Sequence, residues 1–410
     1  MPFKKWPGIT RRGLFKATAV TGVTAGAISI LAGCSHPGDE DAEAPVIVDK
    51  NKAHYVINPE TNESVYSVTD LPISEDKTYN LPLGSVLRPG DGDWLAMTSV
   101  GTTSKPAILG AALSVSAGTV SNVVTSTVTD DTPSIAIFDV RCSDSTYAWV
   151  EMDLLTKSWA LYAAPFSNGE LTGKSTTLWK VNSNWDPPRM AVVGDKVIWQ
   201  VMPSKTGKKT TENSRCYLWK LGSSEARVVV ESPGRFATGP EVSGNTVTMS
   251  PRVHASKGVF YGITAYSLED NLKTVVDQLV LPQSVNPMFA VRIGEKFVFS
   301  IEASYAAGGL LASMGTYIGS SDGSFVVLPR EPAAEVAGKD GLYIVKSRSS
   351  YFVIDTEKER YSTLSAADRT VDYGDFPARD GECKTFVSFA TVKDATTGYP
   401  ASVAVRTFQL

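Results

Sequence analysis

Histidine and cysteine are scarce in this 410-residue chain, which has three His and four Cys. Only His54 and His254 lie beyond residue 50, and neither stands at metal-ligand spacing from another candidate. The sequence also has no CxxC pair. These absences argue against a zinc site and against a disulfide framework. We therefore expect Cys142, Cys216 and Cys383 to be small, partly buried apolar residues.

Signatures of catalysis are missing as well. The sequence contains no nucleophile elbow, no HExxH motif, no phosphate-binding loop and no dinucleotide fingerprint, each of which would indicate a particular reaction or cofactor. The 3.6-residue periodicity of amphipathic helices is nearly absent too. The sequence thus identifies no catalytic residue, no metal and no cofactor, and it favours β structure throughout.

No charged residue occurs between Lys16 and Asp39, whereas the preceding segment is positive and includes Arg11 and Arg12. The uncharged stretch is rich in Ala, Gly and Thr, so it is a weak candidate for a permanent membrane-spanning helix, the alternative interpretation. It ends in Leu31-Ala-Gly-Cys34. The whole segment resembles a bacterial twin-arginine (Tat) export signal with a lipobox.

This resemblance implies a localisation and two partners. Residues 1–33 would be a signal peptide handled by the Tat translocase, with Arg11 and Arg12 as the export signal. Cys34 would be lipidated and would anchor an extracytoplasmic protein to the cell membrane. Residues 34–51, which are acidic and aperiodic, are predicted to form a flexible stalk, and residues 52–410 to form the folded domain.

The exported part is acidic. Without residues 1–33 the chain retains 34 Lys and Arg against 43 Asp and Glu, a net charge of about −9. Nucleic-acid binding is therefore not expected, because the phosphate backbone would be repelled.

Short β-rich hairpins recur along the domain. Each combines an apolar run, a tight turn with Gly, Asp, Asn or Ser, and a stronger apolar run, a pattern typical of hairpins. The seven turns lie at 90–93, 143–144, 194–195, 244–245, 294–295, around 338 and at 380–381. A second set of turns falls between them, which gives four strands per repeat. The sequence predicts an all-β fold, a β-propeller of seven four-stranded blades; tandem β-sandwich domains are the alternative.

The last repeat is one strand short, because only residues 401–410 follow its second hairpin strand. Residues 53–70 are β-rich and belong to no repeat. We expect this N-terminal segment to pair with the C-terminal strand, which would complete the last blade and close the ring.

Two turns, Gly90-Asp-Gly-Asp93 and Arg379-Asp-Gly381, approach the Pro-Asp-Gly turn of TolB-like proteins. The repeat organisation from residue 80 onward resembles the seven-bladed propellers of that family, which supports the predicted architecture.

Loops between blades carry Pro together with charged or aromatic residues. Because these loops converge on one face of a propeller, they predict a ligand-binding surface there. Aromatic rings would stack on the ligand, Arg would donate to anions or amides, and Asp would accept hydrogen bonds. The candidates are Trp185, Asp186, Arg189, Arg235, Phe236, Arg330, Tyr373 and Asp375. In the competing interpretation these side chains only start strands and fill the seams between blades.

Two functions remain open from the sequence. In the first, a cell-envelope lipoprotein presents its propeller face for non-catalytic binding of a protein, peptide or glycan. In the second, an extracytoplasmic carbohydrate-active or other hydrolytic enzyme uses acidic residues at the channel mouth. Sugar hydrolysis requires two carboxyl groups on opposite sides of a bond, so a cross-blade pair such as Asp186 and Asp375 would be needed.

Overall fold

The computed structural model describes residues 42–70, 73–90, 92–100, 108–129, 132–330, 332, 335–347, 350–365 and 375–410. The predicted signal residues Arg11 and Arg12 and the lipidation site Cys34 lie outside this set. Within it, no helix has the length and hydrophobicity that crossing a bilayer requires. The only helical elements described are two short 3-10 turns, η1 (Lys50–Lys52) and η2 (Leu310–Ala312), so the fold is all-β.

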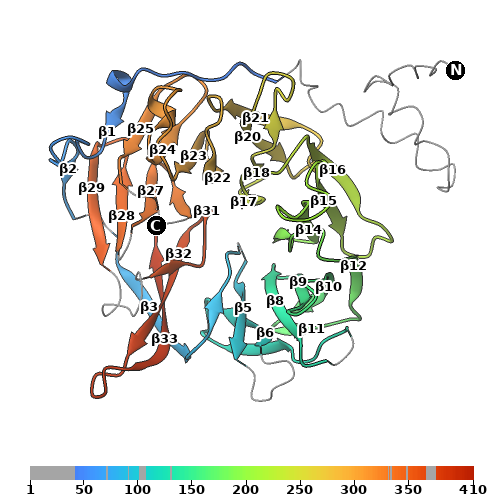
Figure 1. The fold of residues 1–410 in the computed structure, drawn as a ribbon. Coiled ribbons are helices and arrows are strands. Elements are labelled where there is room, and N and C mark those ends of the chain that lie inside the picture. Colours follow the sequence, from blue (N-terminus) through green and yellow to red (C-terminus); the bar gives the residue numbers. More distant parts are fainter. Residues whose placement is uncertain are drawn as a thin grey trace, which may run out of the picture. The chain divides into compact units, whose positions relative to one another are not determined.

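Four blades are formed by strands that are consecutive in sequence, and each blade extends from the centre of a ring to its edge (Figure 1). Blade 1 contains β4 (Val86–Leu87), β5 (Trp94–Val100), β6 (Ile108–Ser114) and β7 (Val120–Val124); blade 2 contains β8 (Ile135–Cys142), β9 (Thr146–Asp153), β10 (Trp159–Ser167), β11 (Glu170–Leu171) and β12 (Thr176–Val181); blade 3 contains β13 (Arg189–Val193), β14 (Lys196–Val201), β15 (Ser214–Lys220) and β16 (Arg227–Ser232); blade 4 contains β17 (Glu241–Ser243), β18 (Thr246–Met249), β19 (Arg252–Val253), β20 (Phe260–Ser267) and β21 (Val275–Val280).

The next two blades also consist of consecutive strands, and each gains a short parallel strand from the N-terminal segment at its outer edge. Blade 5 contains β22 (Pro287–Ile293), β23 (Lys296–Ile301), β24 (Gly315–Gly319), β25 (Phe325–Leu328) and β1 (His54–Tyr55); blade 6 contains β26 (Val336–Lys339), β27 (Leu342–Lys346), β28 (Ser350–Asp355), β29 (Arg360–Ser365) and β2 (Ser67–Val68).

A seventh, composite sheet closes the ring. It contains β30 (Phe376–Pro377), β32 (Thr385–Lys393) and β33 (Pro400–Gln409), and the N-terminal β3 (Glu75–Pro82) forms its outer strand antiparallel to β33. Its inner strand β30 has two residues, and the next strand, β31 (Gly381–Glu382), leaves this sheet and pairs in parallel with β26 of blade 6. The prediction of seven four-stranded blades is therefore wrong: the described residues form six regular blades and one composite sheet.

Closure uses the mechanism expected from the sequence but a different segment. Residues 53–70, the predicted partner of the C-terminal strand, instead add short strands to the outer edges of blades 5 and 6. The segment that pairs with β33 is residues 75–82. Residues 43–48, expected to be part of a flexible stalk, lie against blades 4 and 5, where the Val46 amide donates to Val280 O at 2.9 Å and Val48 is buried. The sheet edges that these segments cover are protected from pairing with other chains.

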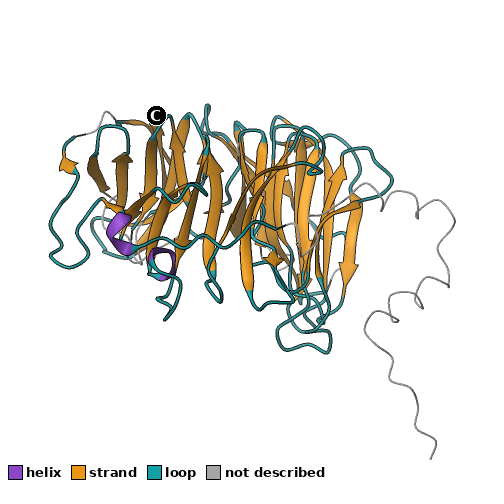
Figure 2. Cartoon of the chain, turned by 90° about the horizontal axis from the view of Figure 1, so that it is seen from above, coloured by secondary structure: helices purple, strands orange, loops and turns teal. Residues whose placement is uncertain are grey.

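The hydrophobic core is divided among the seams. Seven clusters of buried side chains each join two neighbouring sheets, and their order around the ring returns to its start. The sheets stand side by side with their faces in contact (Figure 2). Second strands are enclosed on both faces, which is why β14 reads as the nearly continuous apolar run Lys-Val-Ile-Trp-Gln-Val rather than as an alternating pattern. Trp149 and Trp199 are among the largest fully buried side chains.

Candidate functional site in the central channel

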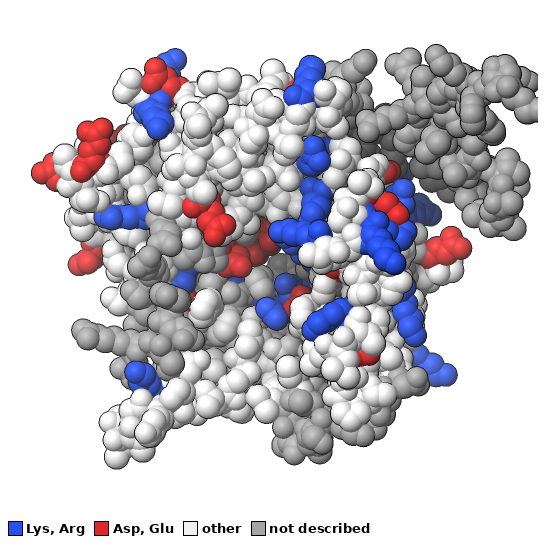
Figure 3. Space-filling model, viewed as in Figure 1, with Lys and Arg blue, Asp and Glu red and all other residues white. Residues whose placement is uncertain are grey.

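A cavity of about 730 Å³ lies in the central channel. Its walls are the inner strands of the blades and the segment 378–384, which joins β30 to β32, contains β31, and is called here the channel loop. Acidic and basic side chains gather around the opening at the centre of the ring (Figure 3). A cavity of this size falls in the range of small-molecule binding sites.

The channel loop crosses the channel toward other blades. Gly381 has a φ of +65°, and a Cβ placed on it would lie 2.7 Å from Val242 O in β17. The Glu382 amide donates to Ser243 Oγ at 3.0 Å, and the Cys383 amide donates to Gly338 O at 3.1 Å. Glycine is suited to this position because it tolerates both the left-handed backbone and the close approach. The loop is thereby fixed against blades 4 and 6.

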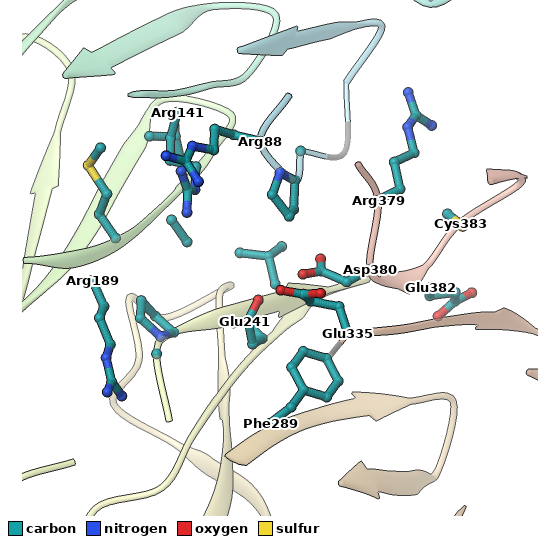
Figure 4. Close-up of a pocket in the computed structure, with 18 of the residues that line it drawn as sticks. Arg88, Arg141, Arg189, Glu241, Phe289, Glu335, Arg379, Asp380, Glu382 and Cys383 are labelled. Carbon is teal, nitrogen blue, oxygen red and sulfur yellow. The ribbon is translucent and has the colours of Figure 1, made fainter. Parts of the chain in front are cut away.

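This crossing brings three carboxyl groups together on one wall, which we call the acidic wall (Figure 4). Glu241 begins β17, Glu335 immediately precedes β26, and Asp380 comes from the channel loop. Burial raises the pKa of Glu241 well above its usual value, and the neighbouring Asp380, to which it is hydrogen-bonded, raises it further. Burial likewise raises the pKa of Glu335 to about 7. The raised pKa values of both glutamates therefore reflect their burial and the neighbouring Asp380 carboxyl group.

A basic wall stands across the cavity, formed by Arg88 after β4 and Arg141 in β8 (Figure 4). Both guanidinium groups bind the same carboxylate oxygen of Asp139, at 3.0 Å from Arg88 Nε and 2.7 Å from Arg141 Nη1. Two positive charges thus share one negative charge, which leaves a net charge of about +1 on this wall. Burial lowers the pKa of Arg88. The nearby Asp139 carboxylate acts in the opposite direction and offsets part of this decrease.

The cavity therefore has oppositely charged sides. Charged groups at the walls of a low-dielectric cleft interact more strongly with a ligand than the same groups would in water. Phe289 of β22 supplies an apolar surface below the acidic wall (Figure 4). This arrangement can bind a polar ligand, and the neighbouring carboxyl groups of Glu241 and Asp380 are also the kind of pair that acid–base chemistry uses.

One predicted binding residue lines the cavity. Arg189, at the start of β13, lies at its edge and donates from Nη1 to Ala237 O at 2.7 Å. Burial lowers the pKa of Arg189.

Four other candidates lie on a rim outside the cavity, where they contact the protein itself. Asp186 accepts from Arg235 Nη2 at 2.6 Å, and Arg235 also donates to Pro203 O. Phe236 is 2% exposed and packs in the seam between blades 3 and 4. Trp185 packs beside the seam between blades 2 and 3, and its carbonyl accepts from Trp159 Nε1 at 3.0 Å. These side chains hold the loops and fill the seams, as the competing interpretation proposed.

The remaining candidates do not form a binding surface in the described part of the chain. Asp375 is fully buried and pairs with Arg406, so it stabilises the seam of the composite sheet. Arg330 donates to Asn62 Oδ1 at 3.2 Å. Tyr373 lies outside the described residues. The two carboxylates expected to form a cross-blade acid pair, Asp186 and Asp375, each bind an arginine instead, Arg235 and Arg406.

Sequence reasoning missed Glu241, Glu335, Asp380, Arg88 and Arg141. Each lies in, or next to, an inner strand or turn of a recognised hairpin. A charged residue at such a position in an otherwise apolar hairpin is the signal that could have identified them. Nothing in the sequence indicated that Asp380 lies beside the two glutamates, because this contact depends on the path of the channel loop away from the composite sheet.

Metal-ligating side chains are not grouped in the described residues: no set of three or more His, Cys, Asp or Glu is placed to hold an ion. Cys142 and Cys216 are buried and Cys383 is partly buried, and all three are free thiols.

No protein-family model matches this chain, and no curated protein matches its sequence. Solved structures similar to it in fold are β-propellers or contain one. The AfRom2 CNH domain shares 9% identity over 82% of this chain and 99% of its own, with a TM-score of 0.46. The propeller domain of the Trilobed protease from Pyrococcus furiosus shares 13% over 63% and 78%, with a TM-score of 0.41. A prolyl endopeptidase shares 10% over 80%, with a TM-score of 0.48, and this chain spans 50% of its length. The likeness is one of fold alone.

Proposed function

We propose that this protein is an extracytoplasmic bacterial lipoprotein that binds part of a peptide, protein or glycan in the central channel of its propeller without chemical conversion. The observation that carries the proposal is the cavity of about 730 Å³ with charged side chains on opposite walls. Crowded like charges in a protein interior lower its stability. A ligand that compensates them explains why they are present.

Ligand capture tests this proposal. The exported chain is incubated with an enzymatic digest of the bacterial envelope, and compounds retained after ultrafiltration are identified by mass spectrometry. The double variant Arg88→Gln/Glu241→Gln alters both walls, and Arg227→Gln/Glu225→Gln is a control with the same charge changes at exposed positions of blade 3. We expect at least tenfold enrichment by the wild type and the control and none by the channel variant. Equal retention by all three proteins, or no retention by the wild type, would overturn the proposal.

The membrane anchor is a separate part of the proposal and rests on the sequence motifs. Replacing Cys34 with Ala should move the exported protein from the membrane fraction to the soluble fraction, whereas Cys216→Ala should leave it on the membrane. Replacing Arg11 and Arg12 with Lys should block export by the Tat translocase. A Cys34→Ala protein that stays membrane-bound would contradict lipidation.

Hydrolysis is the second candidate function, because the hydrogen-bonded pair Glu241 and Asp380 lies in the cavity. In that case one carboxyl group would donate a proton while the other acts as base or nucleophile. Mass spectrometry of the same digest distinguishes the two functions: an enzyme depletes a compound and yields its fragments, whereas a binding protein returns the compound unchanged.

A further inference from the structure

We propose that the channel selects a ligand with a cationic group at one end and a carboxylate at the other, of which a short peptide with free termini is the simplest example. This inference rests on the proposed binding function and names the chemistry that the site recognises. It follows from the separation of the two walls across one cavity, which Figure 4 shows.

The acidic wall fits a primary ammonium group. An ammonium has three N–H donors, and carboxyl oxygens come from Glu241 in blade 4, from Glu335 beside β26 and from Asp380 in the channel loop. A bound cation would reduce the mutual repulsion of these groups and favour their ionised forms. Arg141 lowers the pKa of both glutamates and Arg88 lowers that of Glu335, but both guanidinium groups are paired with Asp139 on the opposite wall.

The basic wall fits a carboxylate. Arg88 and Arg141 share one oxygen of Asp139, so the cluster retains a net positive charge. Guanidinium groups bind carboxylates by charge-assisted hydrogen bonds with defined geometry. A ligand carboxylate bound at this wall would neutralise the positive charge that Asp139 leaves uncompensated.

The two walls act together on a ligand that spans them. A singly charged molecule is attracted by one wall and repelled by the other, whereas a zwitterion is attracted by both, so selectivity comes from the two contacts together. The charge requirement applies to the ends of the ligand. We therefore expect little selectivity for the side chains between them, apart from contact with Phe289.

Calorimetric titration with glycine peptides of two to five residues tests the inference. Each peptide is compared with its N-acetylated form, which lacks the cation, and with its C-terminal amide, which lacks the anion. We expect one length to bind best and each blocked form to bind at least tenfold more weakly. Failure of every free peptide to bind, or less than a twofold effect of blocking, would overturn the inference.

Two variants assign the ends to the walls. Arg88→Gln leaves the Arg141–Asp139 pair intact and removes the excess positive charge, so this variant should no longer discriminate the free peptide from its amide. Glu335→Gln should reduce discrimination against the acetylated form. Arg227→Gln and Glu225→Gln are exposed controls that should change neither ratio. Unchanged discrimination in both channel variants would contradict the assignment.

The capture experiment separates failure of this inference from failure of the proposed function. Capture that depends on the channel, but of a ligand that lacks these charges, would refute this inference alone. Capture that does not depend on the channel would refute the proposed function.

Discussion

On the rim, Arg235 and Asp186 form an ion pair 2.6 Å long, whereas in the channel Glu241, Glu335 and Asp380 face one another. Both regions carry charged side chains near the centre of the ring. The rim matches opposite charges within the protein, and the acidic wall brings like charges together. A charged side chain that is already paired within the protein gains little from binding a ligand. Like charges that are crowded together are stabilised when a ligand of opposite charge binds. This difference is why we propose that the binding function lies in the channel.

The largest expected effect comes from Asp375, a predicted ligand contact that the structure places in a buried pair with Arg406. Asp375→Ala should lower the free energy of unfolding by about 3–5 kcal/mol, because it leaves the buried guanidinium without its main counter-ion. Glu212→Ala breaks the exposed pair with Lys209 and should cost about 0.5 kcal/mol. Urea denaturation measures both. Equal costs would show that the composite sheet does not depend on this pair.

Gly381 tests whether the channel loop is fixed against β17. Gly381→Ala should destabilise the protein by about 2–3 kcal/mol, because the added Cβ enters a strained backbone and meets Val242 O at 2.7 Å. Gly398 is the matched control: its φ is +70°, yet a Cβ there has no neighbour within 4 Å, so Gly398→Ala should cost only about 1 kcal/mol. Similar losses in denaturation would mean that the loop adapts freely.

Glu335 tests the electrostatic cost of the acidic wall. Its pKa of about 7 exceeds the ordinary 4.5, so the unfolded chain releases this proton first and the free energy of unfolding falls as the pH rises from about 4.5 to 7. Glu335→Gln keeps the site neutral. We expect the variant to be more stable than the wild type by about 1–2 kcal/mol at pH 8, after allowing for partial exposure, and nearly equal at pH 4.

The measurement for Glu335 is thermal denaturation across this pH range. Glu225→Gln, at an exposed site, should leave the pH dependence unchanged. A Glu335→Gln variant less stable than the wild type at pH 8 would contradict the view that the acidic wall is held at a cost in stability.

The smallest effect is expected on the rim. Lys209 Nζ lies 5.3 Å from the centre of the Trp185 ring, an exposed cation–π contact that contributes about 0.5 kcal/mol. Lys209→Ala should therefore change the melting temperature only slightly and leave ligand capture unchanged. Loss of ligand capture in this variant would show that the ligand binds at the rim and not in the channel.

The hairpin pattern in the sequence was sufficient to predict the all-β propeller, because second strands such as β14 are enclosed on both faces and therefore read as apolar runs. It also showed that the last sheet lacks an outer strand. It could not select β3 as the closing strand, since residues 53–70 and 75–82 are both compatible with strand structure and only the packing of the ring chooses between them.

The candidate site was less accessible to sequence reasoning. Loop chemistry singled out Arg189, which lines the cavity, but it gave equal weight to Phe236 and Asp375, whose burial arises from contacts between segments distant in sequence. The acidic wall depends on the path of the channel loop, which Gly381 permits but does not by itself predict.

The most direct test of the account is a crystal structure of the protein grown with the glycine peptide that binds best. We predict density in the central channel, with the amino terminus among Glu241, Glu335 and Asp380 and the carboxylate at Arg88 and Arg141. Peptide density beside Trp185 and Arg235, with only water in the channel, would contradict it.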